Sequence, residues 1–203
     1  MTDLPPCAPA DEPLSRVRDR LVAWTLRHRL QSHPAVLALA DLYDRRIAGD
    51  EPTAAEWRSA SAAIDLDLDL DPDLARARDL DRGLDRAHAI DLGLDRARDL
   101  VALLGPRLVL VEALDRTILA ALDASTWRLD MGSYHYHGVC GTTHCRAGSA
   151  IVLHPIGRDL EAVFGPWLAG AAIYLRSTGA VPNFFASDDD ALADMRRAAG
   201  GAS

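Results

Sequence analysis

The apolar residues in the first third of the chain recur at the three- and four-residue spacing of amphipathic helices. One such stripe predicts a helix over residues 14–30. A second stripe begins at Pro34, a favoured residue in a first helical turn, and stops at Gly49, a favoured residue just past a helix end. Thr53 followed by Glu56 is a capping-box pattern, which predicts that a third helix begins there.

These helices form an expected N-terminal unit over residues 13–63, behind a disordered, Pro-containing tail at residues 1–12. Residues 64–105 then become low in complexity, with a loose ten-residue repeat of Leu, Asp and Arg. Apolar pairs four positions apart recur in the repeats, which favours a long helical arm that acts as a spacer or packing element. The Asp-Leu alternation over residues 65–70 has the two-residue period of a strand instead, or would be a disordered lead-in.

Gly105-Pro106 breaks the repeat and opens an expected C-terminal domain over residues 106–199. A His- and Cys-rich loop in this domain is flanked by helical patterns. Apolar spacing predicts these helices over residues 108–122, 143–153, 158–177 with a break near Gly165-Pro166, and 188–198 with Ser187 as N-cap. The whole pattern predicts an all-α fold with, at most, a minor short strand element.

Composition agrees with a helical core and narrows the classes of partner. Hydrophobic residues make up 49% of the chain but aromatic residues only 5%, so Leu, Ala and Val must fill most of the core. The formal net charge is −8, with Arg and acidic residues interleaved, which disfavours nucleic acid and anionic membranes as partners and leaves a protein partner. Residues 1–12 contain no apolar run typical of a signal peptide, so the sequence predicts a cytoplasmic protein with free thiols.

Candidate chemistry concentrates in residues 134–145, which read Tyr-His-Tyr-His-Gly-Val-Cys-Gly-Thr-Thr-His-Cys. This cluster holds three of the seven histidines and two of the three cysteines, namely His135, His137, Cys140, His144 and Cys145. A first interpretation is a site for zinc or another transition metal, with His137, Cys140, His144 and Cys145 as ligands. The Cys-x4-Cys spacing differs from the usual zinc knuckle, and adjacent His144 and Cys145 side chains would diverge.

A second interpretation makes Cys145 a catalytic nucleophile. Thr142 or Thr143 would cap the following helix and put Cys145 in its first turn, where the helix dipole and Arg146 lower the pKa of a thiol. A histidine of the cluster, such as His144, would then act as the base. A third interpretation is structural: the His and Cys side chains pack or bind backbone groups, and the loop is an interaction surface.

Two segments of the predicted C-terminal domain carry distinctive patterns. Residues 140–148 read Cys-Gly-Thr-Thr-His-Cys-Arg-Ala-Gly, after Leu-Asp-Met at residues 129–131. The second segment reads Ile-Tyr-Leu-Arg-Ser-Thr-Gly at residues 173–179, Val-Pro-Asn-Phe-Phe-Ala-Ser at residues 181–187 and Ala-Leu-Ala-Asp at residues 191–194. Together they resemble a C-terminal domain of uncharacterised bacterial and bacteriophage proteins, often found behind pentapeptide or alanine-rich repeats.

This resemblance covers roughly residues 108–199 and implies the architecture and the place of the site rather than a reaction. It implies recurrent roles for Cys140, His144, Cys145 and Arg146, with His137 near a further recurrent histidine. Tyr136 and Ser149 stand where that domain has tryptophan, which would loosen a metal site or pocket.

From these features we expect a non-enzymatic binding or assembly module of bacterial or phage origin, with the His/Cys loop as its functional feature. The alternative is a metal- or thiol-dependent enzyme, with Cys145 as nucleophile and His144 as its partner, or with a transition metal bound by Cys and His. The sequence contains no phosphate-binding glycine loop, no HExxH pair and no serine elbow.

Overall fold

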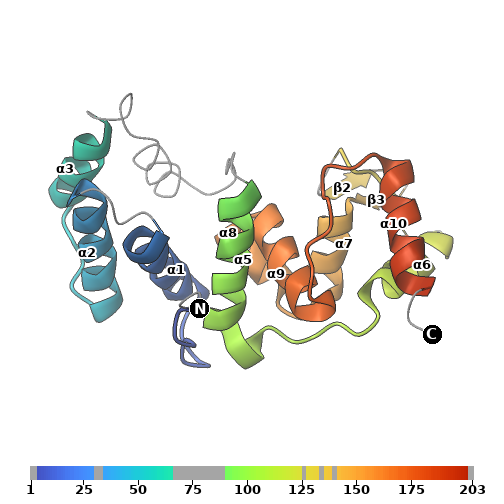
Figure 1. Cartoon of the computed structure of the whole chain (residues 1–203), viewed down its shortest axis with the longest axis horizontal. Helices are drawn as coiled ribbons and strands as arrows, with labels where there is room; N and C mark the ends of the chain where they lie inside the picture. The colour runs from blue at the N-terminus through green and yellow to red at the C-terminus, as the bar shows by residue number, and fades with distance from the viewer. Residues whose placement is uncertain are drawn as a thin grey trace. The chain divides into compact units, whose positions relative to one another are not determined.

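The computed structural model describes residues 4–29, 34–65, 90–124, 127–132, 135–138 and 141–200. The chain divides into two units, Met1–Gly105 and Pro106–Ser203, and each is considered by itself. Helices make up most of both units, and within the described ranges the strands form a single three-stranded sheet in the second unit (Figure 1). The all-α fold class with a minor strand element is therefore confirmed.

The first unit is built from helices that follow the predicted boundaries closely. They are α1 (Leu14–Arg29), α2 (Pro34–Ala48), α3 (Ala54–Asp65) and α5 (Ile90–Leu104). Leu26 and Leu39 belong to the buried core that α1 and α2 share. The capping box forms as predicted, because Thr53 N donates to Glu56 Oε2 at 2.7 Å and Glu56 N donates to the Thr53 hydroxyl at 3.3 Å.

The segment before α1 packs against other residues of the first unit. The backbone N–H of Ala8 donates to the carbonyl oxygen of Leu103 at 2.7 Å, and Arg20 Nε donates to Glu12 at 2.9 Å. Ala8 and Glu12 are both buried. The expectation of a disordered tail is therefore wrong for residues 4–12, because a backbone hydrogen bond and an ion pair hold this segment in place.

Most of the predicted repeat arm, residues 66–89, lies outside the described residues. Its last part is α5, which packs against α1. Ala97, Leu100 and Leu104, which lie on the predicted apolar stripe of the repeat, are fully buried there. This end of the arm is thus a packing element of the first unit.

The second unit contains five helices and three strands among its described residues. They are α6 (Leu114–Asp123), β1 (Trp127–Leu129), β2 (His135–Gly138), β3 (Gly141–His144), α7 (Arg146–Leu153), α8 (Gly157–Phe164), α9 (Pro166–Thr178) and α10 (Asp188–Gly200). The predicted helix over residues 158–177 is α8 followed by α9, parted at the expected break, where Gly165 has φ 78°. The Ser187 hydroxyl accepts from Asp190 N at 3.2 Å, as predicted for the N-cap of α10.

α6 begins at Leu114 rather than at the predicted residue 108. The residues before it are bonded to other elements instead of continuing a helix. Val111 N donates to the Ser177 hydroxyl at 3.1 Å, and Arg176 Nε donates to the carbonyl oxygen of Leu108 at 3.1 Å. These tertiary hydrogen bonds replace the helical ones that the apolar spacing predicts.

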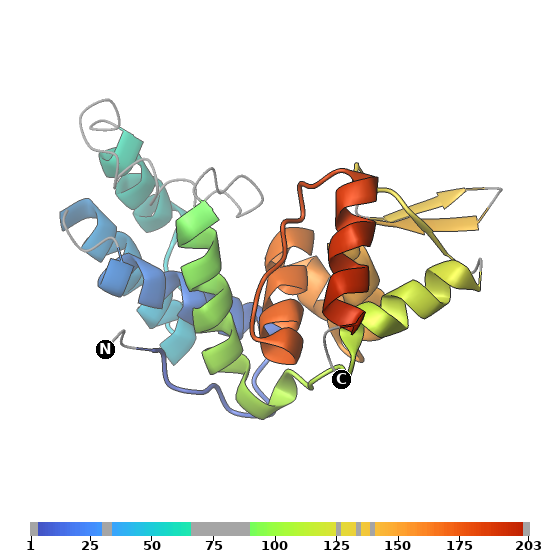
Figure 2. The same ribbon diagram turned by 45° about the vertical axis from the view of Figure 1, so that its right-hand side comes forward.

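The His/Cys stretch forms the strands β2 and β3 rather than a loop. The sheet order is β1-β3-β2, with β3 parallel to β1 and antiparallel to β2. Its register places His135 opposite His144 and His137 opposite Thr142. Figure 2 shows the sheet at one end of the second unit, next to α6 and α10. β3 ends at His144, one residue before α7 begins, so this strand leads directly into α7.

α7 is the central helix of the second unit. Residues 146–151 are all buried, and α7 contacts α6, α8, α9 and β3. Its crossing with α9 is very close, since a Cβ atom built on Gly170 would lie 2.7 Å from Ala147 Cβ and 3.1 Å from Ala147 Cα. A glycine at position 170 lets the two backbones approach this closely.

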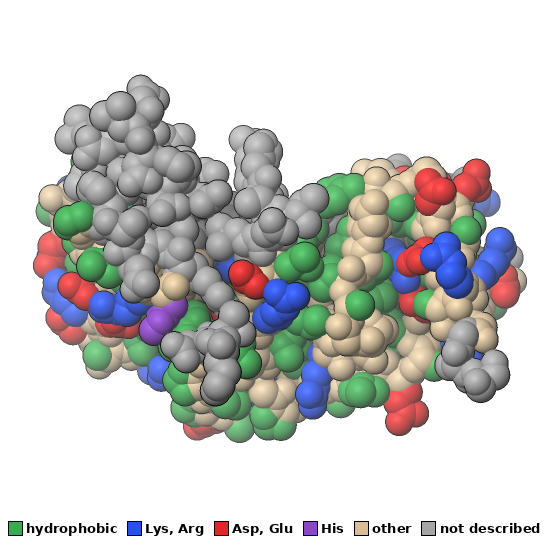
Figure 3. All heavy atoms as spheres, in the orientation of Figure 1, with side chains coloured by type: hydrophobic (Ala, Val, Ile, Leu, Met, Phe, Trp, Pro, Cys, Tyr) green, Lys and Arg blue, Asp and Glu red, His purple; other side chains and the backbone are tan. Residues whose placement is uncertain are grey.

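The surface of the second unit carries both signs of charge. In Figure 3 acidic and basic side chains are interleaved over α10. Arg197 and Asp194, for example, form an ion pair at 3.2 Å.

In the part of the chain that the structure describes, no helix is both long and apolar enough to cross a membrane.

Gly170→Ala is expected to destabilise the protein by about 1–3 kcal/mol, because the added methyl overpacks the crossing of α7 and α9. Gly200→Ala is the matched control, since a Cβ there has no atom within 4 Å, and its effect is expected to stay below about 1 kcal/mol. Urea unfolding of both variants measures the difference. Equal stabilities would contradict the close crossing.

Candidate functional site

His144 and Cys145 lie at the junction of β3 and α7, and both are at most 3% exposed. The His144 ring meets Trp127 edge-on, with 5.2 Å between the ring centroids. The carbonyl oxygen of His144 accepts a hydrogen bond from Asp130 N at 3.1 Å. β1 and the residue after it therefore fix this junction through a ring contact and a backbone hydrogen bond.

Cys145 is itself the N-cap of α7, whereas the sequence predicts it in the first turn behind Thr142 or Thr143. Its sulfur accepts a hydrogen bond from Gly148 N at 3.3 Å. Burial raises the pKa of the Cys145 thiol, and it outweighs the backbone hydrogen bonds, which favour the thiolate. The predicted lowering of this pKa is therefore wrong, because the helix end is buried and carboxylates compensate the charge of Arg146.

The other residues of the cluster are described in part. Cys140 lies outside the described residues, and only the backbone of His135 and His137 is described. Among the side chains that the structure does describe, no group of three or more His, Cys, Asp or Glu is arranged to hold a metal ion. The predicted metal site needs Cys140 and the His137 side chain, so it stays a prediction.

The first residue of α7, Arg146, carries a guanidinium that is only 3% exposed. Its Nη2 donates to both oxygens of Asp115 in α6, at 2.9 and 2.8 Å, and its Nε donates to Asp115 Oδ1 at 3.1 Å. Nε also lies 3.0 Å from the hydroxyl of Tyr174 in α9, and Nη1 donates to Asp194 in α10 at 2.5 Å. We call these four residues, Arg146, Asp115, Tyr174 and Asp194, the Arg146 cluster.

Burial and mutual contacts set the ionisation states of the side chains in the Arg146 cluster. Burial alone would lower the pKa of Arg146, but its contacts with Tyr174, Asp115 and Asp194 raise it, so the guanidinium stays charged. The hydrogen bond from Arg146 lowers the pKa of Asp194. Burial raises the pKa of Tyr174 well above its ordinary value, so its hydroxyl stays protonated and donates to Asp115 Oδ1 at 2.7 Å.

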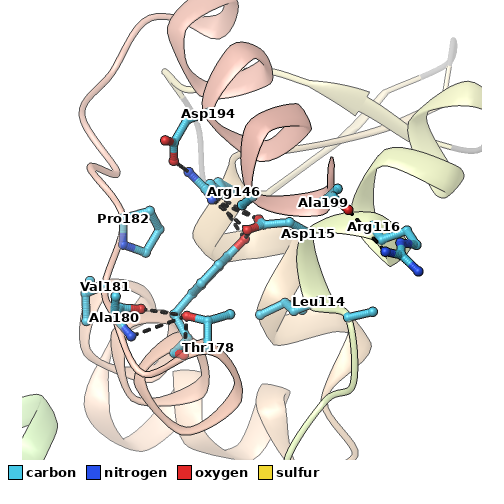
Figure 4. Close-up of a pocket in the computed structure, with 13 residues that line it drawn as sticks. Leu114, Asp115, Arg116, Arg146, Thr178, Ala180, Val181, Pro182, Asp194 and Ala199 are labelled. Carbon is cyan, nitrogen blue, oxygen red and sulfur yellow. Dashed lines mark hydrogen bonds and ion pairs between the residues drawn. The ribbon is translucent and has the colours of Figure 1, made fainter. Parts of the chain in front are cut away.

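The Arg146 cluster forms one wall of an open cavity of about 380 Å³. Figure 4 shows Arg146 and Asp194 on one side of this cavity, with Val181 and Pro182 across from them. The N-cap of α6, Ala113, and the first three residues of that helix also line it. Since the polar cluster faces apolar walls, the cavity has the make-up of a small-molecule site.

Local signals in the second segment shape the far wall of the cavity. Gly179 ends α9 in the left-handed conformation, with φ 79°. The hydroxyl of Thr178 donates to the carbonyl oxygen of Ala180 at 2.9 Å, which tightens the turn into Val181 and Pro182. These local contacts shape the turn that leads into Val181 and Pro182, which line the cavity.

Sequence reasoning did not single out Asp115 or Arg116, both of which line the cavity. Asp115 falls in the middle of the helix predicted over residues 108–122, where a single acidic residue gives no signal of a site. Arg146 entered as a positive neighbour of Cys145 and as a recurrent position of the resembling domain, but without a role of its own. The signal that could have found them is the need of a buried arginine for a carboxylate partner, which local sequence does not reveal.

Asp115→Ala is expected to lower the free energy of unfolding by about 3–5 kcal/mol, because it leaves Arg146 buried without its main counterion. Asp194→Ala is expected to lower it by about 1 kcal/mol or less, since the Asp194 side chain is 43% exposed. Urea unfolding compares the two, with Asp115→Asn as a milder variant in case Asp115→Ala does not fold. Similar losses for the Asp115 and Asp194 variants would rule out the dominant role of Asp115.

In a Cys7→Ser, Cys140→Ser background, Cys145 is expected to react with iodoacetamide more slowly in the folded than in the urea-unfolded chain. The reason is that burial keeps the thiol protonated and covered, whereas an activated thiolate would react faster in the folded state. Alkylation rates between about pH 6 and pH 8.5, measured by mass spectrometry, test this. Faster labelling of the folded chain below about pH 7 would restore the nucleophile interpretation.

Comparisons with known proteins do not assign the chain to a family. No protein-family model matches the chain, and neither a curated protein nor a solved structure matches it. Its function is therefore inferred from its own residues.

Proposed function

We propose that the second unit is a non-enzymatic binding module and that the cavity beside the Arg146 cluster is its binding site. The observation that supports this is the cavity itself, about 380 Å³ in volume, with a hydrogen-bonded charged cluster on one wall and apolar residues on another. Small-molecule sites commonly combine this range of volume with a few convergent polar groups on apolar walls. A concave site of this size fits a small ligand better than a flat assembly surface.

The two segments that resemble the bacterial and bacteriophage domain support the same location. Arg146 belongs to the first segment, while Tyr174 and Asp194 belong to the second. These three residues are far apart in the sequence but meet through hydrogen bonds at the cavity wall. A bacterial or phage origin, implied by the resemblance, is part of the proposal.

In this proposal the His/Cys stretch acts as a support for the site. β3 leads into α7, and the Cys145 sulfur caps that helix through Gly148 N. The cap fixes the first turn of α7, in which Arg146 lies. The proposal therefore moves the binding function from the His/Cys stretch to the cavity, and the stretch contributes by positioning Arg146.

The thiol-enzyme alternative is less well supported. It needs Cys145 as a thiolate near neutral pH, whereas burial raises the pKa of this thiol and its sulfur already accepts a backbone hydrogen bond. The metal-dependent alternative rests on Cys140 and on the His137 side chain, and no observation of the described residues favours it.

Ala198→Trp is expected to abolish ligand binding, because Ala198 lines the cavity on an exposed face of α10 and an indole there would fill the opening. Ala193→Trp is the matched control, since Ala193 is exposed on the same helix and does not line the cavity. Ligand-observed NMR with a general fragment library, run on the full chain and both variants, measures binding. Circular dichroism checks that both variants remain folded.

The expected result is a set of fragments that bind the unchanged protein and the Ala193→Trp variant but not the Ala198→Trp variant. Fragments that bind all three proteins equally would place binding outside the cavity. A library with no binder at all would also overturn the proposal.

A further inference from the structure

Given the binding function proposed above, on which this assignment depends, we propose that the cavity binds small molecules that carry an oxyanion, a carboxylate or a phosphate, on an apolar body. Arg146 binds the oxyanion, at the place that the Asp194 carboxylate holds in the free protein, and Arg116 adds a positive charge at another edge of the cavity. The assignment follows from the balance of hydrogen-bond donors and acceptors around the cavity.

The buried acceptor of the cavity wall, Asp115, has little capacity left for a cationic ligand. Its Oδ1 accepts from Arg146 Nε, from Arg146 Nη2 and from the Tyr174 hydroxyl, while its Oδ2 accepts from Arg146 Nη2. A carboxylate offers about two acceptor positions on each oxygen, so Oδ1 is fully used and Oδ2 keeps one. An amine or guanidine placed in the cavity would therefore find at most one acceptor position on Asp115, whose charge Arg146 already compensates.

The cavity also has hydrogen-bond donors that no carboxylate uses. Arg116 lines the cavity and donates one hydrogen bond, from Nη2 to the carbonyl oxygen of Ala199 at 3.1 Å. It forms no ion pair with any carboxylate of the described residues. Because a guanidinium has five N–H donors, Arg116 brings an unpaired positive charge and several free donors to the cavity.

The start of α6 adds donors to this charge. Residues 113–116, the N-cap and the first three helical positions, line the cavity, and no side chain caps them. The first N–H groups of a helix have no partner within the helix, and the helix dipole makes this end favourable for a negative group. This feature reinforces the preference that the two arginines already set.

Asp194 shows which chemistry the outer side of the Arg146 guanidinium accepts. Unlike Asp115, it contacts Arg146 through a single oxygen, and its side chain is 43% exposed at the rim of the cavity (Figure 4). A ligand carboxylate or phosphate can make the same charge-assisted hydrogen bond to Nη1. Asp194 is therefore an exchangeable partner, and it competes with the ligand for Arg146.

The remaining walls select what the oxyanion is attached to. Leu114, Val181 and Pro182 line the cavity opposite or beside the Arg146 cluster, and the Tyr174 side chain forms part of its lining. Since a volume of about 380 Å³ is at the lower end of the range for drug-sized ligands, a single ring or a short aliphatic body fits.

The test uses phenylacetate and phenyl phosphate as the two oxyanion probes, phenylacetamide as a neutral probe and phenethylamine as a cationic one. NMR titrations of the full chain at constant ionic strength give the dissociation constants. At least one oxyanion probe is expected to bind, and the two arms show whether the carboxylate or the phosphate is preferred. Phenylacetamide and phenethylamine are expected to bind at least about tenfold more weakly.

Two variants with charge-matched controls assign the contacts. Arg116→Gln is expected to weaken oxyanion binding about two- to threefold relative to Arg196→Gln, because it removes a positive charge from the cavity whereas Arg196→Gln removes the same charge from an exposed position outside it. Asp194→Asn is expected to strengthen binding about three- to tenfold relative to Asp189→Asn, because it removes the competing carboxylate. Ala198→Trp should block binding altogether.

The outcomes separate this inference from the proposed function. Equal or tighter binding of phenylacetamide or phenethylamine, blocked by Ala198→Trp, would overturn the oxyanion assignment and leave the binding function standing. Oxyanion binding that is the same in Arg116→Gln and Arg196→Gln, or that survives Ala198→Trp, would also overturn it. If no probe and no library fragment binds, both the assignment and the proposed function fail.

Discussion

The buried guanidinium of Arg146 is the constraint on which the second unit depends. A charge at this depth is tolerated only when counterions and acceptors are in place, because an unpaired buried ion costs several kcal/mol or more. Asp115, Tyr174 and Asp194 supply these partners from three different helices. α6, α9 and α10 must therefore lie where their polar groups reach one end of α7. The cavity is bounded by this meeting of helices, since each of them contributes lining residues.

The other contacts of α7 stabilise the same arrangement of helices around Arg146. Gly170 lets α9 approach Ala147 closely enough for Tyr174 to reach the guanidinium. The Cys145 sulfur caps the helix whose first residue is Arg146, by accepting a hydrogen bond from Gly148 N. In the function that we propose, the His/Cys stretch contributes by positioning Arg146. Cys145 and Arg146 are adjacent in the sequence, and only the packing shows that Cys145 caps α7 while Arg146 lines the cavity.

Local sequence signals predict the helices well and fail where distant contacts decide. Pro34, Gly49 and Thr53 act on the backbone beside them, so the ends of α2 and the start of α3 can be read directly from the sequence. β2 and β3 are four residues each and lack an apolar alternation, so no two-residue period reveals them. Asp115 lies 31 positions from Arg146, and nothing beside it in the sequence distinguishes a buried counterion from a solvated acid on a helix surface.

The net negative charge of the chain acts on an anion over long distances, whereas the hydrogen-bond donors of the cavity act only in direct contact. The formal net charge is −8, which opposes the approach of an anion. At physiological ionic strength the Debye length is about 8 Å, so exposed carboxylates farther away than this are largely screened. Arg146 lines the cavity itself and would contact a seated ligand directly. The screened long-range field is therefore weak at the cavity and does not cancel the hydrogen bonds that a bound anion makes there. Such a site suits a small ligand selected by short-range geometry, whereas a polyanion spread over the surface would meet the unscreened charge of many carboxylates.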